Sequence, residues 1–354
     1  MRSLYIASTE GSGGKTTLSV GLCLALRARG LDAGYFKPVG TMPQVSSTGE
    51  RVDEDAAFVA DVLGLTEPLS DVCPVVLDEG ALHEVLAGAD DDTLGRVQAA
   101  FERVGRGRDL VVCEGLGEIW QGRFLRASGA DVVAGLDLRA VLVARFAGAR
   151  LLDDICYVKD GLMQRLLGVI FNMVPEGRLE LVRGEYTRFL DEQDIATYGV
   201  LAASRRLAAI TVGEIVEALG ATYICGEEHA DNLAETYLIG AMSPEHALRY
   251  FQNAANKVVV VGGDRAEIIL AALDTPTAAI VLTGSYVPSP TVLSRAQELG
   301  VPVVSVPSDT VAATDAIQRL FGRLGVHDAR KIELISDQIT RSLDLDRLIG
   351  DLQR

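Results

Sequence analysis

Residues 9–17 read Thr9-Glu10-Gly11-Ser12-Gly13-Gly14-Lys15-Thr16-Thr17. The apolar run Leu4–Ala7 precedes them and a helical pattern follows over 18–28. This order is typical of a phosphate-binding loop, because backbone N–H groups, a helix N-terminus and the lysine ammonium all attract phosphate oxygens. The sequence therefore predicts that all nine residues bind a nucleotide and that the Thr16 hydroxyl faces a magnesium ion.

The match to the pattern G-x-x-x-x-G-K-[ST] is incomplete, because Thr9 stands where the first glycine belongs. The alternative is that these glycines only turn the chain from a strand into a helix. The flanking strand and helix favour a phosphate loop.

Composition and charge limit the classes to which this protein can belong. A chain of 354 residues predicts two domains. The formal net charge is -16, with acidic residues spread along the chain, so we expect no nucleic-acid partner. No run approaches the eighteen or so apolar residues of a membrane span, and no cleavable leader precedes the first strand. We expect a cytoplasmic protein with no membrane partner, in which the five scattered cysteines are buried thiols.

Short apolar runs alternate with helical patterns over a first domain, residues 1–208. This alternation predicts an α/β fold, with a parallel sheet and helices on both faces. The expected helices end before glycines and cover 16–29, 55–63 and 93–104. Segment 71–92, rich in Asp and Gly, is expected to be a loop or lid with little regular structure.

A second alternating block predicts a smaller α/β domain over residues 211–325, with strands at 257–261, 278–282 and 301–306. Only the polar turn Ser204-Arg205-Arg206 joins the two domains. A C-terminal extension, 326–354, is expected to pack on the second domain.

An acid ends one of the predicted strands. Residues 109–113 are followed by Glu114, and ligands of such folds lie at the carboxyl ends of strands. With Thr16 and one acid of Asp53-Glu54-Asp55, Glu114 could hold magnesium through oxygen ligands. The alternative is a solvated acid at a strand end.

Two other strand ends carry polar residues. Lys37 precedes Pro38 and could face a nucleotide or an anionic substrate, or lie on the surface. Asn172 could bind a base edge with its amide, or start the turn before Pro175.

Four motifs occur in the order and spacing of dethiobiotin synthetase, which the first domain resembles. They are residues 9–16, Lys37-Pro38-Val39, Glu114-Gly115-x-Gly117 and Gly168-Val-Ile-Phe-Asn172. The resemblance implies a P-loop NTPase-type α/β fold, usually homodimeric, that uses ATP and magnesium to phosphorylate a carbamate before ring closure.

The same resemblance implies roles for single residues. Lys15 would contact phosphate, Lys37 would face substrate and Asn172 would contact adenine. The residues around magnesium would be Thr16, Asp55 and Glu114.

The second block resembles the DRTGG domain through Gly263-Asp264-Arg265 and Thr283-Gly284, with Ser285 in place of the usual second glycine. Together the two domains resemble the N-terminal, regulatory half of long bacterial phosphate acetyltransferases. The acetyltransferase domain is not found in this sequence, so we expect no acetyl transfer by it. Arg265 could form a salt bridge with Asp264 that caps a helix, or help to bind a small anionic ligand.

One turn departs from dethiobiotin synthetase. Glu118 and Trp120 follow Gly117 where that family tends to have a small residue and a glycine, so dethiobiotin synthesis itself is not expected. Trp120 could serve in packing, in a dimer contact or in a pocket wall.

Three functions are compatible with these residues to different degrees. The favoured function is that of a nucleotide-responsive regulatory or sensor protein. The family resemblance implies that this protein is a homo-oligomer. The second is an ATP-dependent ligase or kinase acting on a carboxylate or carbamate, with Lys15 and Lys37 as catalytic residues that stabilise the transferred phosphoryl group. The third, a dinucleotide-binding oxidoreductase, lacks the G-x-G-x-x-G pattern.

Overall fold

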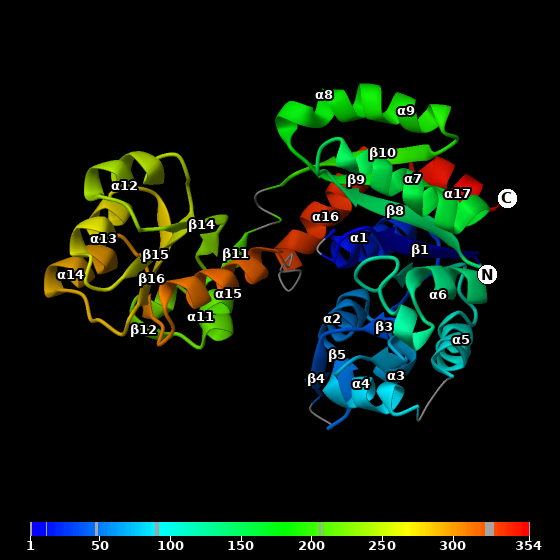
Figure 1. The fold of residues 1–354 in the computed structure, drawn as a ribbon, viewed down its shortest axis with the longest axis horizontal. Coiled ribbons are helices and arrows are strands. Elements are labelled where there is room, and N and C mark those ends of the chain that lie inside the picture. Colours follow the sequence, from blue (N-terminus) through cyan, green and yellow to red (C-terminus); the bar gives the residue numbers. More distant parts are fainter. Residues whose placement is uncertain are drawn as a thin grey trace. The chain divides into compact units, whose positions relative to one another are not determined.

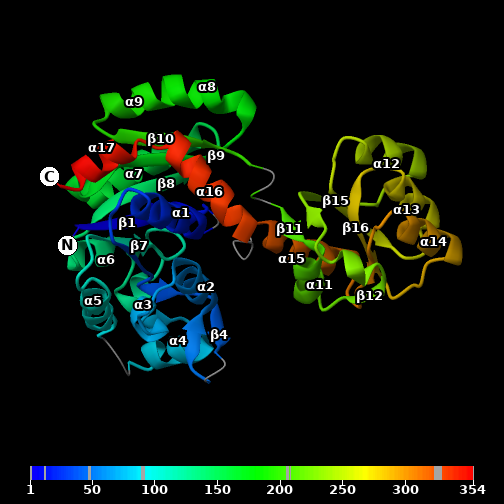
Figure 2. The ribbon, with the colours of Figure 1, turned by 180° about the vertical axis from the view of Figure 1, so that it is seen from behind.

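The computed structural model describes residues 2–11, 13–46, 49–88, 92–204, 207, 209–322 and 329–353. The chain divides into two compact units (Figures 1 and 2). The first unit consists of Met1–Ala203 with Val326–Arg354, and the second of Ser204–Gly325. Arg205 and Arg206 of the predicted connecting turn lie outside the described residues.

The first unit contains a six-stranded sheet in the order β10-β9-β8-β1-β7-β2, and every pairing in it is parallel. Its central strands are buried along most of their length, as expected for a parallel sheet covered on both faces. The strands are β1 Arg2–Ser8, β2 Ala33–Phe36, β7 Leu110–Glu114, β8 Arg139–Arg145, β9 Leu166–Val174 and β10 Ala196–Ala202.

Helices cover both faces of this sheet. One hydrophobic core joins alternate strand residues such as Tyr5 and Val111 to the helices on one side, and α1 contacts β1, β2 and β7. The main helices are α1 Lys15–Arg27, α2 Glu54–Leu63, α5 Thr93–Val104, α6 Gly129–Gly135, α7 Arg150–Leu162 and α9 Thr187–Glu192, which continues the short α8 Leu179–Leu181 and a π-helical turn Val182–Tyr186. Short 3-10 turns occur at Arg123–Leu125, Met163–Arg165 and Glu176–Arg178. The predicted fold class and the three predicted helices are confirmed.

The prediction of an unstructured loop over 71–92 is wrong for the residues described there. The segment contains α3 Leu69–Val72, β6 Val75–Val76 and α4 Glu79–Leu86, while 89–91 lie outside the described residues. β6 pairs with β3 Val39–Gly40, and the nearby hairpin is β4 Pro43–Val45 with β5 Arg51–Asp53. The short strand forms because a tertiary partner supplies its hydrogen bonds, which local sequence does not show.

The C-terminal segment packs on the first unit, so the prediction that it packs on the second domain is wrong. It forms α16 Ala329–Ser342 and α17 Leu345–Asp351, and α16 contacts α1 and β10. Ile335 and Ile339 are buried against Gly21 of α1. A Cβ atom at Gly21 would lie 2.3 Å from Ile339 Cδ1, so the absence of a side chain permits the close approach.

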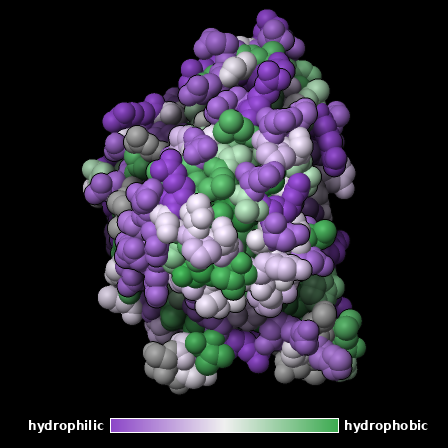
Figure 3. Space-filling model, turned by 90° about the vertical axis from the view of Figure 1, so that its left-hand side faces the viewer, coloured by the Kyte–Doolittle hydropathy of each residue, from purple (hydrophilic) through white to green (hydrophobic). Residues whose placement is uncertain are grey.

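The second unit is built on a five-stranded sheet in the order β12-β17-β16-β15-β14. β12 is antiparallel to β17 and the other pairings are parallel. One core lies between the sheet and α12, α13 and α14, and a second lies on the side of α11 and α15. Figure 3 shows the side of this unit at the left of Figure 1, where hydrophobic groups are separated by hydrophilic side chains.

The elements of the second unit follow the predicted alternation. The strands are β11 Ile210–Thr211, β12 Thr222–Cys225, β13 Leu233–Ala234, β14 Thr236–Ile239, β15 Lys257–Gly262, β16 Thr277–Thr283 and β17 Val303–Ser305. The helices are α11 Val212–Leu219, α12 Pro244–Phe251, α13 Ala266–Leu273, α14 Pro290–Glu298 and α15 Thr310–Gly322, with a 3-10 turn at Glu227–His229.

Within the described ranges no helix is long and apolar enough to cross a membrane. The five cysteines are free thiols; Cys156 and Cys225 are half-buried and the other three are buried.

Candidate functional site: a phosphate loop beside a buried acidic cluster

The phosphate loop connects β1 to α1 in a tight turn. Gly14 has a φ of 82°, a left-handed conformation that glycine adopts without strain. A Cβ at Gly13 would lie 2.4 Å from Ser8 Oγ, so this position also requires glycine. Ser8 Oγ accepts a hydrogen bond from Glu10 N at 3.1 Å, while Ser12 lies outside the described residues. The glycines therefore have a local steric role that suits a compact anion-binding turn.

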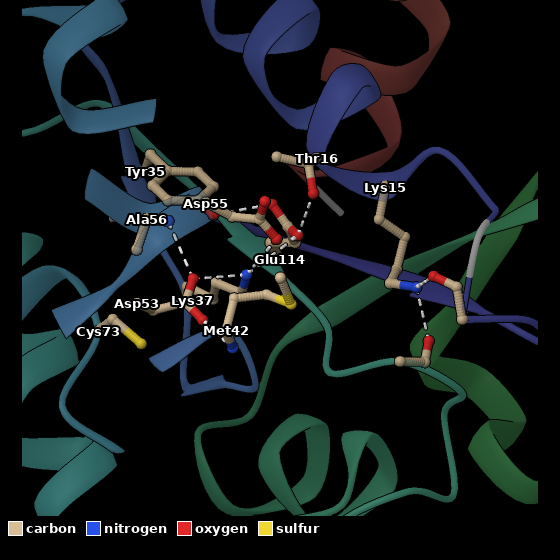
Figure 4. A network of polar contacts seen from close by, with 12 residues as sticks. Lys15, Thr16, Tyr35, Lys37, Met42, Asp53, Asp55, Ala56, Cys73 and Glu114 are labelled. Carbon is tan, nitrogen blue, oxygen red and sulfur yellow. Dashed lines mark hydrogen bonds and ion pairs between the residues drawn. The ribbon is translucent and has the colours of Figure 1, made fainter. Parts of the chain in front are cut away.

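The Lys15 ammonium points back into this loop (Figure 4). Nζ donates to the carbonyl oxygens of Glu10 at 3.2 Å, Gly11 at 3.3 Å and Gly117 at 2.6 Å. Burial lowers the Lys15 pKa to about 8, because the three acceptors are neutral and only partly replace water. A buried cation with only neutral direct partners is suited to receive an anion.

Glu114 ends β7 beside α1, as predicted, and it is buried. Its Oε1 accepts from Thr16 Oγ1 at 2.7 Å, and its Oε2 accepts from Tyr35 Oη at 2.7 Å. Burial raises the pKa of Glu114, and the Lys37 ammonium opposes that rise. Burial and the neighbouring Glu114 raise the pKa of Tyr35 well above its usual value, so Tyr35 stays a neutral donor.

Lys37 lies between carboxylates, not at the protein surface. Nζ is 2.8 Å from Asp53 Oδ1, 2.9 Å from Asp55 Oδ2 and 3.9 Å from Glu114 Oε1. Burial alone would lower the pKa of Lys37, but the three carboxylates outweigh it and raise that pKa above its usual value. The surface alternative for Lys37 is therefore wrong: the side chain is a buried counter-cation.

Asp53, one of the three acids considered for magnesium, is instead the buried partner of Lys37. Besides Lys37, it accepts from Met42 N at 2.9 Å and from Ala56 N at 3.0 Å, so it also caps the N-terminus of α2. Gly40 lies so close that a Cβ there would be 2.3 Å from Asp53 Oδ2. The signal was present in the sequence, because an Asp directly before a helical run is a preferred N-cap.

The structure brings the predicted magnesium residues to one place (Figure 4). Thr16 and Glu114 form an oxygen pair that suits a hard cation, whereas Asp55 is held by the Lys37 ammonium. Over the part of the chain that is described, no group of three or more His, Cys, Asp and Glu side chains is arranged to hold a metal ion. The residues thus fit magnesium through Thr16 and Glu114, with Asp55 separated from them by Lys37.

Asn172 lies against the phosphate loop. Its Nδ2 donates to Gly13 O at 2.9 Å and its Oδ1 accepts from Met173 N at 2.9 Å. The neighbouring strand end carries Arg145, whose Nη1 is 4.0 Å from Glu10 Oε2 and which the sequence analysis missed. Contact of Asn172 with adenine remains a prediction.

Glu118 and Trp120 bind one another. Trp120 Nε1 donates to Glu118 Oε2 at 2.6 Å, and the indole packs edge-on against Tyr157 of α7 with ring centroids 6.3 Å apart. About half of Trp120 is exposed, at 44%. The packing role considered for Trp120 is therefore present within the chain.

Arg265 of the second unit binds backbone carbonyls. Its Nη1 donates to Gly240 O at 2.5 Å and its Nη2 to Met242 O at 2.8 Å, which ties the end of β14 to the start of α13. Thr283 and Thr310 share a hydroxyl hydrogen bond of 2.8 Å. The partners of Arg265 are thus backbone carbonyls and not Asp264. A part for Arg265 in binding a small anionic ligand remains a prediction.

A parallel sheet with a glycine-rich loop between β1 and α1 and an acid at the end of β7 defines a P-loop nucleotide-binding fold. A family model described as an AAA domain matches residues 2–217, and one described as a DRTGG domain matches residues 214–320. The chain belongs to this AAA-domain family of P-loop proteins and carries a DRTGG domain in addition.

Curated relatives confirm the two resemblances. The chain is 25% identical to phosphate acetyltransferase of Deinococcus radiodurans over 364 residues, which is 97% of this chain and 50% of the relative. It therefore spans about half the length of such relatives. It is also 31% identical to an ATP-dependent dethiobiotin synthetase of Anaeromyxobacter dehalogenans over 201 residues, covering 52% of this chain and 86% of the relative.

Among solved structures, the MinD cell division protein of Aquifex aeolicus is 17% identical with a TM-score of 0.37, covering 58% of this chain and 84% of that one.

Proposed function

We propose that the first unit binds ATP with magnesium and that the protein is a nucleotide-responsive regulator. The observation that carries this proposal is the buried Lys15 ammonium, which has only neutral carbonyl partners within the phosphate loop. Phosphate oxygens are charged acceptors, and hydrogen bonds to charged groups are roughly twice as strong as neutral ones. Binding of a triphosphate would therefore satisfy a cation that the protein alone leaves weakly compensated.

Thr17 supports the same proposal. Its hydroxyl is buried in the first turn of α1 and has no hydrogen-bond partner within the described ranges. A buried polar group without a partner costs about 1–3 kcal/mol. A phosphate group at the N-terminus of α1 would supply an acceptor close to this turn.

Magnesium would be held by Thr16 and Glu114. Their oxygens are 2.7 Å apart, and Tyr35 fixes the far oxygen of the same carboxylate. Bound magnesium would neutralise phosphate charge and lower the cost of burying Glu114 as an anion. Direct contact of Asp55 with the ion would require it to leave Lys37.

The state of Lys37 favours regulation over catalysis. A catalytic lysine would direct its ammonium at the substrate, but here two buried or half-buried carboxylates bind it at 2.8 and 2.9 Å. The regulatory function also agrees with a DRTGG domain in the same chain. A homo-oligomeric state, a small anionic ligand at the DRTGG domain and a cytoplasmic location remain predictions.

An ATP-dependent ligase or kinase is the second candidate. One observation favours it: Lys15, Thr16, Lys37 and Glu114 are all present and adjacent in a chain that aligns with 86% of a dethiobiotin synthetase. In such an enzyme Lys15 and Lys37 would stabilise charge on the transferred phosphoryl group of a carboxylate or carbamate.

Calorimetric titration with ATP and magnesium tests the proposal on the full chain. We expect binding by the wild type, loss of binding in Lys15→Ala and retention in the control Lys159→Ala on α7. Unchanged affinity in Lys15→Ala would contradict the phosphate-loop assignment. ADP release should then be followed with a panel of small carboxylic acids: release at background supports a regulator, whereas stimulation by one acid supports the ligase.

A further inference from the structure

A cavity of about 230 Å³ lies in the first unit behind the Lys37 cluster, and neither the nucleotide nor the magnesium proposal uses it. Segments far apart in the sequence form its walls: β5, α3, β6, α4, α5 and the 3-10 turn Arg123–Leu125. Its aliphatic lining includes Val75, Val85 and Leu125, and its cationic lining consists of Arg51 and Arg96. The cavity therefore joins an apolar wall to two guanidinium groups.

We propose that this cavity binds a short-chain aliphatic carboxylate. Guanidinium groups bind carboxylates through paired N–H donors, and the aliphatic side chains would receive a hydrocarbon tail. A cavity of this volume has room for a short hydrocarbon chain as well as a carboxylate head. Hexanoate, with a short aliphatic tail and one carboxylate, represents this class of ligand.

Arg51 forms an ion pair at the cavity wall, and 56% of its side chain is exposed. Its Nη1 is 3.0 Å from Asp78 Oδ2. A guanidinium has five N–H donors, so one ion pair leaves donors for a ligand carboxylate. The two arginines come from different elements, β5 and α5, and Arg96 also has an interaction of its own within the chain.

The cavity wall is continuous with the strands that position Lys37. Lys37 N donates to Val72 O at 2.8 Å, and Leu77 N donates to Gly40 O at 2.8 Å. β6, which contributes Val75 to the lining, pairs with β3 two residues after Lys37. A ligand in the cavity would thus stabilise the same backbone that carries the buried counter-cation of the acidic cluster.

The test is titration of the full chain with hexanoate, measured by calorimetry and by ligand-observed NMR. We expect hexanoate to bind, and hexanol and hexylamine, which lack the anionic head, to bind at least about tenfold more weakly. Arg51→Gln and Arg96→Gln should each weaken hexanoate binding about tenfold. The matched surface control Arg188→Gln should bind like the wild type.

Two further variants test whether hexanoate binds in this cavity and not at the phosphate loop. Ser70→Trp places a large side chain into the cavity from α3 without removing a core residue, and it should abolish hexanoate binding while circular dichroism stays unchanged. Lys15→Ala should bind hexanoate normally, because the cavity is separate from the phosphate loop; this outcome is independent of ATP binding. Equal binding of hexanoate and hexanol, full binding by Ser70→Trp, or loss of binding only in Lys15→Ala would each overturn the proposal.

Discussion

The Lys37 ammonium lies 2.8 Å from the Asp53 carboxylate, and both side chains are buried. Asp53 also accepts two backbone N–H groups, from Met42 and Ala56, so one carboxylate joins a counter-cation, a loop and the N-terminus of α2. Removing one partner of a buried ion pair is far more costly than the net contribution of the pair, because the other charge stays buried.

Asp53→Asn should therefore destabilise the first unit even though asparagine can still cap α2. Lys37 would keep Asp55 and Glu114, so we expect a loss of about 2–4 kcal/mol in the free energy of unfolding, at or below the usual range for a broken buried pair. Urea unfolding followed by circular dichroism measures it. Asp61→Asn on the exposed face of α2 is the control, and an equally small effect in both variants would contradict a buried pair.

Lys15 should make stability depend on pH. Its folded-state pKa, about 8, is lower than its ordinary value of 10.5, so the charged form is disfavoured in the folded protein. The cost is fully present below pH 8, and stability should rise with pH between about 8 and 10.5 as the unfolded chain holds more protons than the folded one. A difference of 2.5 pKa values corresponds to about 3 kcal/mol.

Lys15→Met removes this cost. At pH 7 the variant should be more stable than the wild type by up to about 3 kcal/mol, less the three lost hydrogen bonds, and the advantage should shrink as the pH approaches 10.5. Urea midpoints at several pH values measure the difference. Thr9→Val, an uncharged change in the same loop, should give a constant difference, and a constant difference for Lys15→Met would show that the ammonium is not strained by burial.

Arg265 should stabilise the second unit through its two carbonyl partners. Arg265→Met keeps the aliphatic stem but leaves the carbonyls of Gly240 and Met242 without the guanidinium, so we expect a loss of about 1–3 kcal/mol. Arg295→Met is the matched control, because its ion pairs with Asp274 and Glu298 are surface pairs of about 0–1 kcal/mol. Hydrogen exchange of β14 and β15 amides localises the effect to this sheet.

Local patterns in the sequence were sufficient for the phosphate loop and for Glu114. The loop glycines, Lys15 and Thr16 are contiguous, and an apolar strand ending in an acid is visible in five residues. The role of Tyr35 could not be predicted in this way. Its hydrogen bond to Glu114 requires that β2 lies next to β7, and the sequences of the two strands do not reveal their order in the sheet. Lys37 was placed correctly at a strand end, but its burial depends on Asp53 arriving from β5.

The sequence did not show what short strands and amphipathic helices pack against. The segment 71–92 contains strand β6 of only two residues, which exists because Val39–Gly40 pairs with it. The apolar side of α16 is evident in the sequence, yet a helix with one apolar side fits any apolar surface. On α1, Gly21 leaves room for Ile335 and Ile339 of α16, and it lies more than three hundred positions earlier in the chain.

Gly21 of α1 lies in close contact with α16. Gly21→Ala would ordinarily strengthen a helix by up to about 1 kcal/mol, but here a Cβ would lie 2.3 Å from Ile339 Cδ1 and 2.5 Å from Ile335 Cγ2. Overpacking of this kind costs about 1–3 kcal/mol, so the variant should be destabilised. Gly161→Ala in α7 is the matched control: nothing lies within 4 Å of a Cβ there, and it should be neutral or stabilising.

Ile339→Ala tests whether α16 causes the effect of Gly21→Ala. Alone it should destabilise by about 2–5 kcal/mol through the cavity that it creates. Combined with Gly21→Ala it should cost less than the sum of the two single changes, because the new methyl group fills part of that cavity. Strictly additive changes in the free energy of unfolding would show that α1 and α16 do not pack together in solution. A combined cost below the sum would show that α16 packs on α1, the helix that follows the phosphate loop.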